Sequence, residues 1–109
     1  MIEAGFQVEK GISGLPTSFR ATWEGATGEP MIALLAEYDA LPGIGHACGH
    51  NLIGTATIGA ALALKDAYPQ LPGKIVVLGT PAEEECGGKI IMCQNGVFDE
   101  VDAAMMVHS

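Results

Sequence analysis

The stretch that decides the fold of this chain is Met31-Ile32-Ala33-Leu34-Leu35-Ala36, an unbroken apolar run that follows Pro30. A run without polar alternation is typical of a strand whose two faces are both covered, as in a parallel sheet. Two more runs of largely apolar residues lie at residues 74–79 and 103–107. We therefore predict three apolar strands in one parallel core.

The segments between these strands are predicted to be helices. Residues 52–66 have helical length and many small residues, which suit close packing on a sheet, and Asn51 is a candidate N-terminal cap. Residues 89–93 predict a second, short helix that ends before Asn95-Gly96. The resulting order of strands and helices predicts an α/β fold, a three-layer arrangement with parallel core strands and flanking helices.

The N-terminal part of the chain has a different pattern. Residues 6–10 and 17–23 alternate apolar and polar side chains across a Gly- and Pro-containing connection, which predicts a hairpin-like pair of strands. Residues 1–4, which precede Gly5, are interpreted as the last turn of a helix. No internal repeat or low-complexity linker divides the sequence, so residues 1–109 are taken as one domain or as part of a larger one.

Composition excludes several classes of function. A hydrophobic fraction of 49% argues for a folded core, and a net charge of −8 argues against binding to nucleic acid. Lys65, Lys74 and Lys89 are too dispersed to form a basic site. Three cysteines without a secreted disulfide framework indicate a reducing, cytoplasmic compartment. No signal peptide is visible, and the apolar stretch at residues 52–64 is shorter than the roughly 20 residues of a membrane span.

Side chains that bind metals or transfer protons follow each of the three predicted strands. They are Asp39 after the first strand, Glu83 and Glu84 after the second, His108 after the third, and Cys48 and His50 at the end of the loop that follows the first. Ligands bind beyond the carboxyl ends of the strands in such sheets. We therefore predict that these residues share one site.

The residue types suit a metal-activated hydrolase. Thiolate and imidazole are favoured ligands of zinc-class metals, and a helix N-terminus would favour the thiolate of Cys48. Adjacent carboxylates beside a metal divide their work, one as ligand and one as general base. Each residue alone also has a plainer interpretation. A Cys-Gly-His loop can be incidental, paired glutamates can be solvated, His108 can simply end a strand, and Asp39 can form a turn.

Three segments together resemble one known family. They are Ala36-Glu37-Tyr38-Asp39-Ala40-Leu41-Pro42, His46-Ala47-Cys48-Gly49-His50-Asn51 and Thr80-Pro81-Ala82-Glu83-Glu84. On these motifs the chain is similar to the co-catalytic metallopeptidases and amidohydrolases of the aminoacylase and carboxypeptidase G family, peptidase family M20. It resembles the Cys-Gly-His branch, and within it the aminoacylase-like dipeptidases and aminobenzoyl-glutamate hydrolase in particular.

The resemblance implies a role for each candidate residue. Cys48 would bridge two divalent ions, which could be zinc, manganese or cobalt, and the terminal ligands would be His50, Glu84 and His108. Glu83 would be the general base for a water held between the two ions, and Asp39 would orient the site. The implied activity is hydrolysis of the amide bond of an N-acyl amino acid or a dipeptide.

The chain also departs from the family pattern. Glu37 stands where some members have a ligand histidine, so a ligand role does not carry over, and Asn51 replaces the aspartate common in auxin-conjugate hydrolases. The inserted domain, through which the full-length parent is expected to form a homodimer, has no counterpart, nor has a final ligand histidine. We therefore interpret residues 1–109 as a partial zinc-peptidase-like catalytic domain that is inactive, or nearly so, by itself.

Two other classes of function remain open at this point. The chain could be an inactive remnant that acts only as a metal-binding or interaction module. It could also be a thiol enzyme, with Cys48 as nucleophile and His50 as base, although residues one apart on a loop point in divergent directions.

Overall fold

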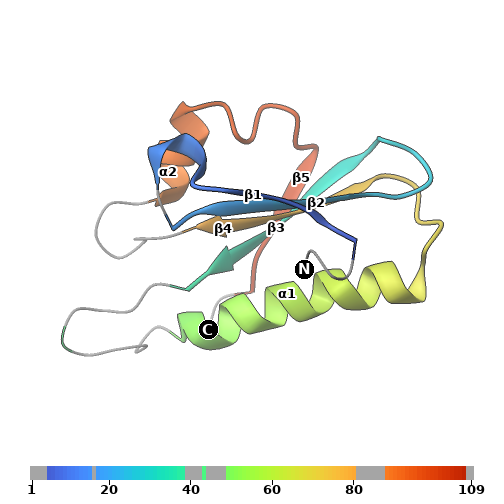
Figure 1. Ribbon diagram of the computed structural model, residues 1–109, viewed down its shortest axis with the longest axis horizontal. Helices are drawn as coiled ribbons and strands as arrows, with labels where there is room; N and C mark the ends of the chain where they lie inside the picture. Colours follow the sequence, from blue (N-terminus) through green and yellow to red (C-terminus); the bar gives the residue numbers. More distant parts are fainter. Residues whose placement is uncertain (1–4, 16, 39–42, 44–48, 81–87, 108–109) are drawn as a thin grey trace.

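The computed structural model describes residues 5–15, 17–38, 43, 49–80 and 88–107 (Figure 1). These residues form a five-stranded sheet in the order β1-β2-β4-β3-β5. The strands are β1 (Gln7–Lys10), β2 (Phe19–Glu24), β3 (Met31–Glu37), β4 (Lys74–Thr80) and β5 (Ala103–Met105). The helical segments are the 3-10 turn η2 (Ile12–Gly14), α1 (His50–Ala67) and α2 (Gly88–Gln94).

The parallel part of the sheet is centred on β3. This strand pairs in parallel with β4 on one side and with β5 on the other. The chain passes from β3 through α1 to β4, and then from β4 through α2 back past β3 to β5. Since parallel crossovers are right-handed, two crossovers that run in opposite directions must lie on opposite faces of the sheet. Figure 1 shows α1 along one face and α2, with η2, on the other.

Two apolar clusters, one on each face, confirm the three-layer arrangement. On the α1 face, Ala61 and Ile58 pack with strand residues such as Leu34 and Val77. On the α2 face, Met92 packs in a second cluster with other residues of the sheet and of η2. Successive side chains of a strand point to opposite faces, so the unbroken apolar sequences of β3 and β4 supply both clusters. The predicted α/β fold with flanking helices is confirmed.

The N-terminal strands form the predicted antiparallel pair. β1 pairs with β2, and β2 continues the sheet by pairing antiparallel with β4. In this register Phe19 lies opposite Gly79, and its ring stacks on Tyr38 with the ring centroids 6.2 Å apart. A Cβ atom on Gly79 would lie 2.2 Å from the ring carbons of Phe19. Glycine is therefore required where this aromatic ring crosses β4.

Two local expectations were wrong. The helix predicted from residue 52 begins at His50, and its cap is Gly49, whose φ of 74° suits a glycine. Asn51 therefore lies inside the helix and is not its cap. The third strand covers residues 103–105, shorter than predicted, and all three residues are exposed because β5 has one neighbouring strand. The helical turn expected at residues 1–4 lies outside the described residues.

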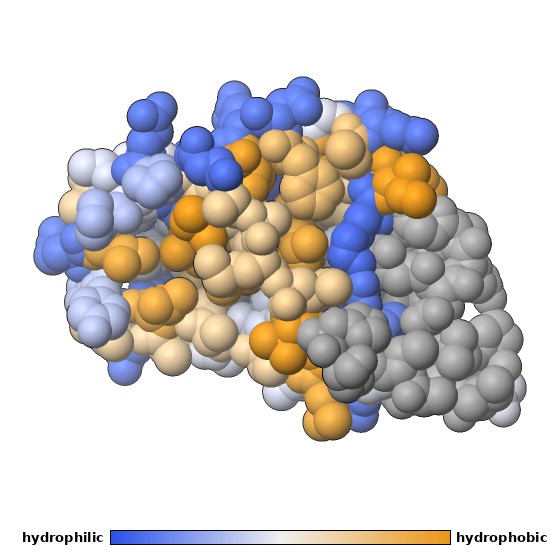
Figure 2. Space-filling view, turned by 180° about the vertical axis from the view of Figure 1, so that it is seen from behind, coloured by the Kyte–Doolittle hydropathy of each residue, from blue (hydrophilic) through white to orange (hydrophobic). Residues whose placement is uncertain are grey.

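An apolar surface surrounds β5. Figure 2, which views the molecule from behind, shows apolar residues gathered across the middle of this face. Met105 and Val107 are 57% and 65% exposed. Among the described residues, no helix has both the length and the apolar character needed to cross a membrane.

Substituting Gly79 with alanine tests the packing of β2 on β4. Gly79→Ala forces the ring of Phe19 to move, and we expect a loss of about 1–3 kcal/mol in the free energy of unfolding. Gly59→Ala is the matched control, because Gly59 lies on an exposed position of α1 with open space around its Cβ direction. It should raise stability by roughly 0.4–1 kcal/mol. Thermal unfolding measures both, and equal effects would contradict the packing described.

Candidate active site

The ends of β3 and β4 form the frame of the candidate site. Glu37 and Thr80 end these neighbouring parallel strands and are register partners. Beyond them the chain turns to α1 on one face and to α2 on the other. Such a switch of direction opens a crevice at the carboxyl ends of the strands, where ligands of α/β proteins bind. The hydroxyl of Thr80 donates to the carbonyl oxygen of Ala36 at 3.2 Å and ties the two strand ends together.

His50 is the predicted ligand that the structure describes. It is the first residue of α1, only 1% of its surface is exposed, and its Nε2 lies 2.8 Å from Oε2 of Glu37. Glu37 is itself only 5% exposed. An imidazole and a carboxylate from two different elements thus meet, out of water, at the carboxyl end of β3.

Lys89 completes this group from the opposite face of the sheet. It lies in α2, and its Nζ donates to Oε1 of Glu37 and forms an ion pair with it. A buried carboxylate is costly unless it is paired and hydrogen-bonded. The lysine supplies that pairing, so Glu37 links the first residue of α1 to the second residue of α2.

Close packing holds the beginning of α1 against the end of β3. A Cβ on Gly54 would lie 3.0 Å from the carbonyl oxygen of Glu37, so the helix approaches the strand as closely as a glycine allows. One turn further on, the hydroxyl of Thr57 donates to the carbonyl oxygen of Leu35 at 3.0 Å, and Thr57 is buried. These two contacts set the height of His50 above the strand.

The other predicted site residues lie outside the described residues. They are Asp39, Cys48, Glu83, Glu84 and His108. Within the part of the chain that the structure describes, no group of three or more His, Cys, Asp or Glu side chains could hold a metal ion. The proposed convergence of these ligands therefore remains a prediction.

Sequence reasoning missed the group around Glu37. It gave Glu37 no ligand role and set Lys89 aside as a dispersed lysine. The available signal was an acidic residue at the end of an apolar strand, since a charge in that position has to be either solvated or paired. Its partner could not be identified, because Lys89 is 52 residues away in the sequence.

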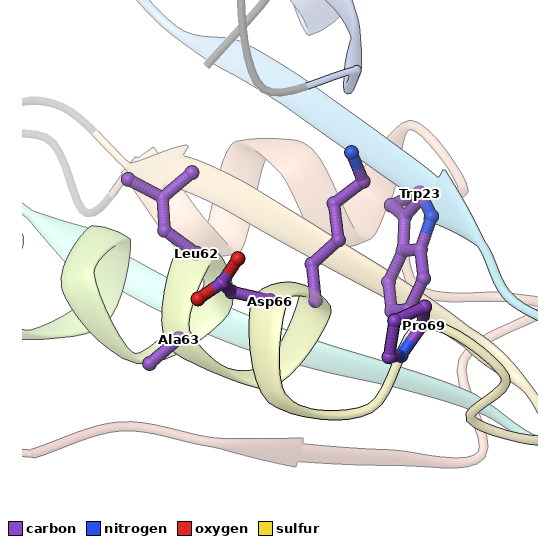
Figure 3. A pocket seen from close by; sticks show the side chains of 6 residues that line it. Trp23, Leu62, Ala63, Asp66 and Pro69 are labelled. Atoms are coloured by element: carbon purple, nitrogen blue, oxygen red, sulfur yellow. The ribbon is translucent and has the colours of Figure 1, made fainter.

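Two pockets lie on the α1 side. One of about 310 Å³ borders the site and is lined by Thr17, Phe19, Ala36, Tyr38, Asn51, Gly54, Thr55 and Ile58. The second, of about 690 Å³, lies at the opposite end of α1 and is lined by Trp23, Leu62, Ala63, Lys65, Asp66 and Pro69 (Figure 3). Its first α1 residue follows His50 by roughly 18 Å along the helix. The first pocket, rather than the second, adjoins the candidate chemistry.

The fold and the position of this site define an α/β protein with a polar centre beyond the ends of its parallel strands. The model of the peptidase family M20/M25/M40 matches residues 33–109, which is more than half of the chain. The chain therefore belongs to this family. The family resemblance stated from the three motifs is confirmed.

Curated relatives include the two kinds that the motifs indicated. Xaa-Arg dipeptidase of Mus musculus is 50% identical over 104 residues, which cover 87% of this chain and 24% of the relative. A p-aminobenzoyl-glutamate hydrolase polypeptide of Escherichia coli (strain K12) is 41% identical over 124 residues, covering 96% and 25%. The chain thus spans about a quarter of the length of these relatives.

A solved structure matches the same fold. The YXEP protein of Bacillus subtilis, described as a dinuclear metal binding peptidase from the M20 family, superposes with a TM-score of 0.82 at 29% identity. The match covers 94% of this chain and 33% of that one.

The described residues are compatible with a metal site. Metal-binding histidines in proteins are commonly oriented by a carboxylate, and the contact between His50 and Glu37 has this composition. His50 would hold a metal ion together with the predicted ligands that lie outside the described residues. The thiolate, imidazole and carboxylate donors of that set suit zinc-class divalent ions.

The hydroxyl of Thr57 provides a test of how α1 is held. Thr57→Val keeps the shape of the side chain but removes the donor to Leu35, and we expect about 1 kcal/mol lower stability. Thr55→Val is the control, because Thr55 is exposed and donates to Asn51 within the same helix. The control should change stability by less than about 0.5 kcal/mol. Chemical denaturation measures both, and an equal loss would contradict a special role for Thr57.

Proposed function

We propose that the full-length protein that carries this chain is a metal-dependent amidohydrolase that cleaves dipeptides or N-acyl amino acids. The observation that carries the proposal is the buried His50 beside Glu37 at the switch point between β3 and β4. Cys48 precedes His50 by two residues, and Glu83 and Glu84 follow the end of β4 by three and four residues. The names of the relatives support a hydrolase of this substrate class.

In this proposal the ligands are provided by all three parallel strands and their loops. Cys48 bridges two divalent ions, zinc, manganese or cobalt, and the terminal ligands are His50, Glu84 and His108. The description of the related Bacillus protein as dinuclear supports two ions rather than one. When bound, the ions supply positive charge that polarises the scissile carbonyl and lowers the pKa of water.

Glu83 carries the proton transfers of the proposed reaction. Its carboxylate takes a proton from the attacking water and passes that proton to the leaving amine. Asp39 orients the site, since it follows the end of β3 by two residues. Water adds across the amide and the bond breaks, so the products are a carboxylate and an amine.

Replacing Glu83 tests this assignment. In the full-length protein, Glu83→Gln should lower kcat by roughly 10²–10⁴-fold, because a general base is lost while its shape is kept. Zinc uptake should stay unchanged, since Glu83 is not a proposed ligand. Hydrolysis of a dipeptide with C-terminal arginine and of p-aminobenzoyl-glutamate measures the first effect, and elemental analysis measures the second.

The neighbouring carboxylate Glu85 gives the control, because it has the same charge and no proposed role. Glu85→Gln should leave turnover and metal content unchanged, whereas Glu84→Gln should lose metal. Equal losses in Glu83→Gln and Glu85→Gln would contradict the assignment of the base.

Removing the metal distinguishes the proposed hydrolase from a thiol enzyme. A chelator should abolish hydrolysis, and manganese, zinc or cobalt should restore it. Activity that survives the chelator but is lost on alkylation would instead support Cys48 as a nucleophile. Metal uptake without turnover of any amide would support a binding module.

Three further proposals concern the protein as a whole. Residues 1–109 form part of a catalytic domain and are inactive, or nearly so, by themselves. The full-length protein forms a homodimer through an inserted domain. It works in a reducing, cytoplasmic compartment, as three cysteines without a disulfide framework indicate.

A further inference from the structure

We propose that Glu37 and Lys89 position His50 for metal binding. Lys89 holds the carboxylate of Glu37, and the carboxylate in turn fixes the orientation of the imidazole ring. This inference rests on the proposed function, because it takes His50 as a metal ligand. It assigns a role to two residues that the family motifs leave without one.

The geometry of the carboxylate carries the proposal. Oε2 lies 2.8 Å from Nε2 of His50, and Oε1 accepts from Nζ of Lys89. The two contacts engage both oxygens, so rotation of the carboxylate about its last bond would break both at once. An imidazole on the first residue of a helix would otherwise have two unrestrained torsions. Holding one ring nitrogen to a fixed carboxylate removes most of that freedom before a metal binds.

The origin of the three side chains strengthens this interpretation. Glu37 ends β3, His50 begins α1 on one face of the sheet, and Lys89 lies in α2 on the other. The contact therefore joins three layers at the switch point. Each of the two loops that lead to the proposed ligands Cys48 and Glu84 has a member of this group next to one of its ends.

Stability alone gives a weak reason for such a group. Buried ion pairs roughly break even against well-packed apolar residues, because desolvation offsets most of the Coulomb attraction. A Met or Leu at position 37 could fill the same space in an otherwise apolar strand. The group makes sense if the imidazole needs a partner of defined direction, as metal-binding histidines commonly do.

Charge alone and positioning make opposite predictions for Lys89. If the lysine acted only through its charge, its removal would strengthen the binding of a cation by removing repulsion. If it acts by holding Glu37, its removal releases the carboxylate and weakens binding. Lys89→Met is therefore the decisive variant.

The experiment measures zinc affinity by competition with a chromophoric chelator in the full-length protein. We expect Glu37→Gln and Lys89→Met to bind zinc roughly 10–100-fold more weakly than the wild type. Lys89→Arg, which keeps a donor to Oε1, should recover most of the affinity. Lys74→Met is the matched control, because Lys74 pairs loosely with Glu24 at 4.0 Å at the other end of β4. It should bind zinc as the wild type does.

A second measurement reads the ring directly and does not require metal. In metal-free protein labelled with ¹⁵N-histidine, long-range ¹H–¹⁵N spectra should show His50 with its hydrogen on Nε2, facing Glu37. Glu37→Gln and Lys89→Met should both shift these signals, and Lys74→Met should not. A change confined to overall folding would lower the melting temperature without altering the ring signals of the folded protein.

Several outcomes would overturn the proposal. Tighter zinc binding by Lys89→Met would reduce the lysine to a charge effect, and unchanged affinity and ring signals in Glu37→Gln would remove the positioning role. If Lys89→Met does not fold, Lys89→Arg and Glu37→Gln decide by the same two measurements. A wild-type protein that binds no zinc would refute the proposed function, and the ring signals would still test the contact itself.

Discussion

The opposite directions of two right-handed crossovers set the arrangement of this protein. β3 has a parallel partner on each side, and the chain reaches them through helices that must lie on different faces. The loops that leave β3 and β4 therefore diverge, and their divergence opens the one place where side chains from both layers can meet. The candidate site lies there because of this topology rather than because of any single motif.

The price of that location is a charge inside an apolar sheet. Glu37 follows six apolar residues and is nearly inaccessible to water, so its carboxylate has to be paired within the protein. Lys89 and His50 supply the pairing from the two helices. The same contacts that make the charge tolerable also link the first turns of α1 and α2, so the energetic requirement and the geometry of the site have a common solution.

Much of the fold was predictable from local pattern. The unbroken apolar runs identified β3 and β4, and alternation identified the β1–β2 pair, because burial on two faces or one leaves a direct mark on neighbouring residues. The start of α1 was not predicted correctly. Asn51 is a favoured cap by composition, but the backbone of Gly49 can adopt a positive φ and begins the helix earlier than that cap would. β5 has the apolar sequence of a covered strand and yet is exposed, since it has one neighbouring strand among the described residues.

The sequence by itself determined the family of this protein, its α/β class and the residue types of its proposed chemistry, because motifs and periodicities are properties of adjacent residues. The tertiary structure decided that His50 begins a helix, that α1 and α2 cover opposite faces, and that Glu37 lies between His50 and Lys89. The partners Glu37 and Lys89 are 52 residues apart. Contacts over such a separation depend on how the crossovers fold back on the sheet, and no local pattern encodes that path.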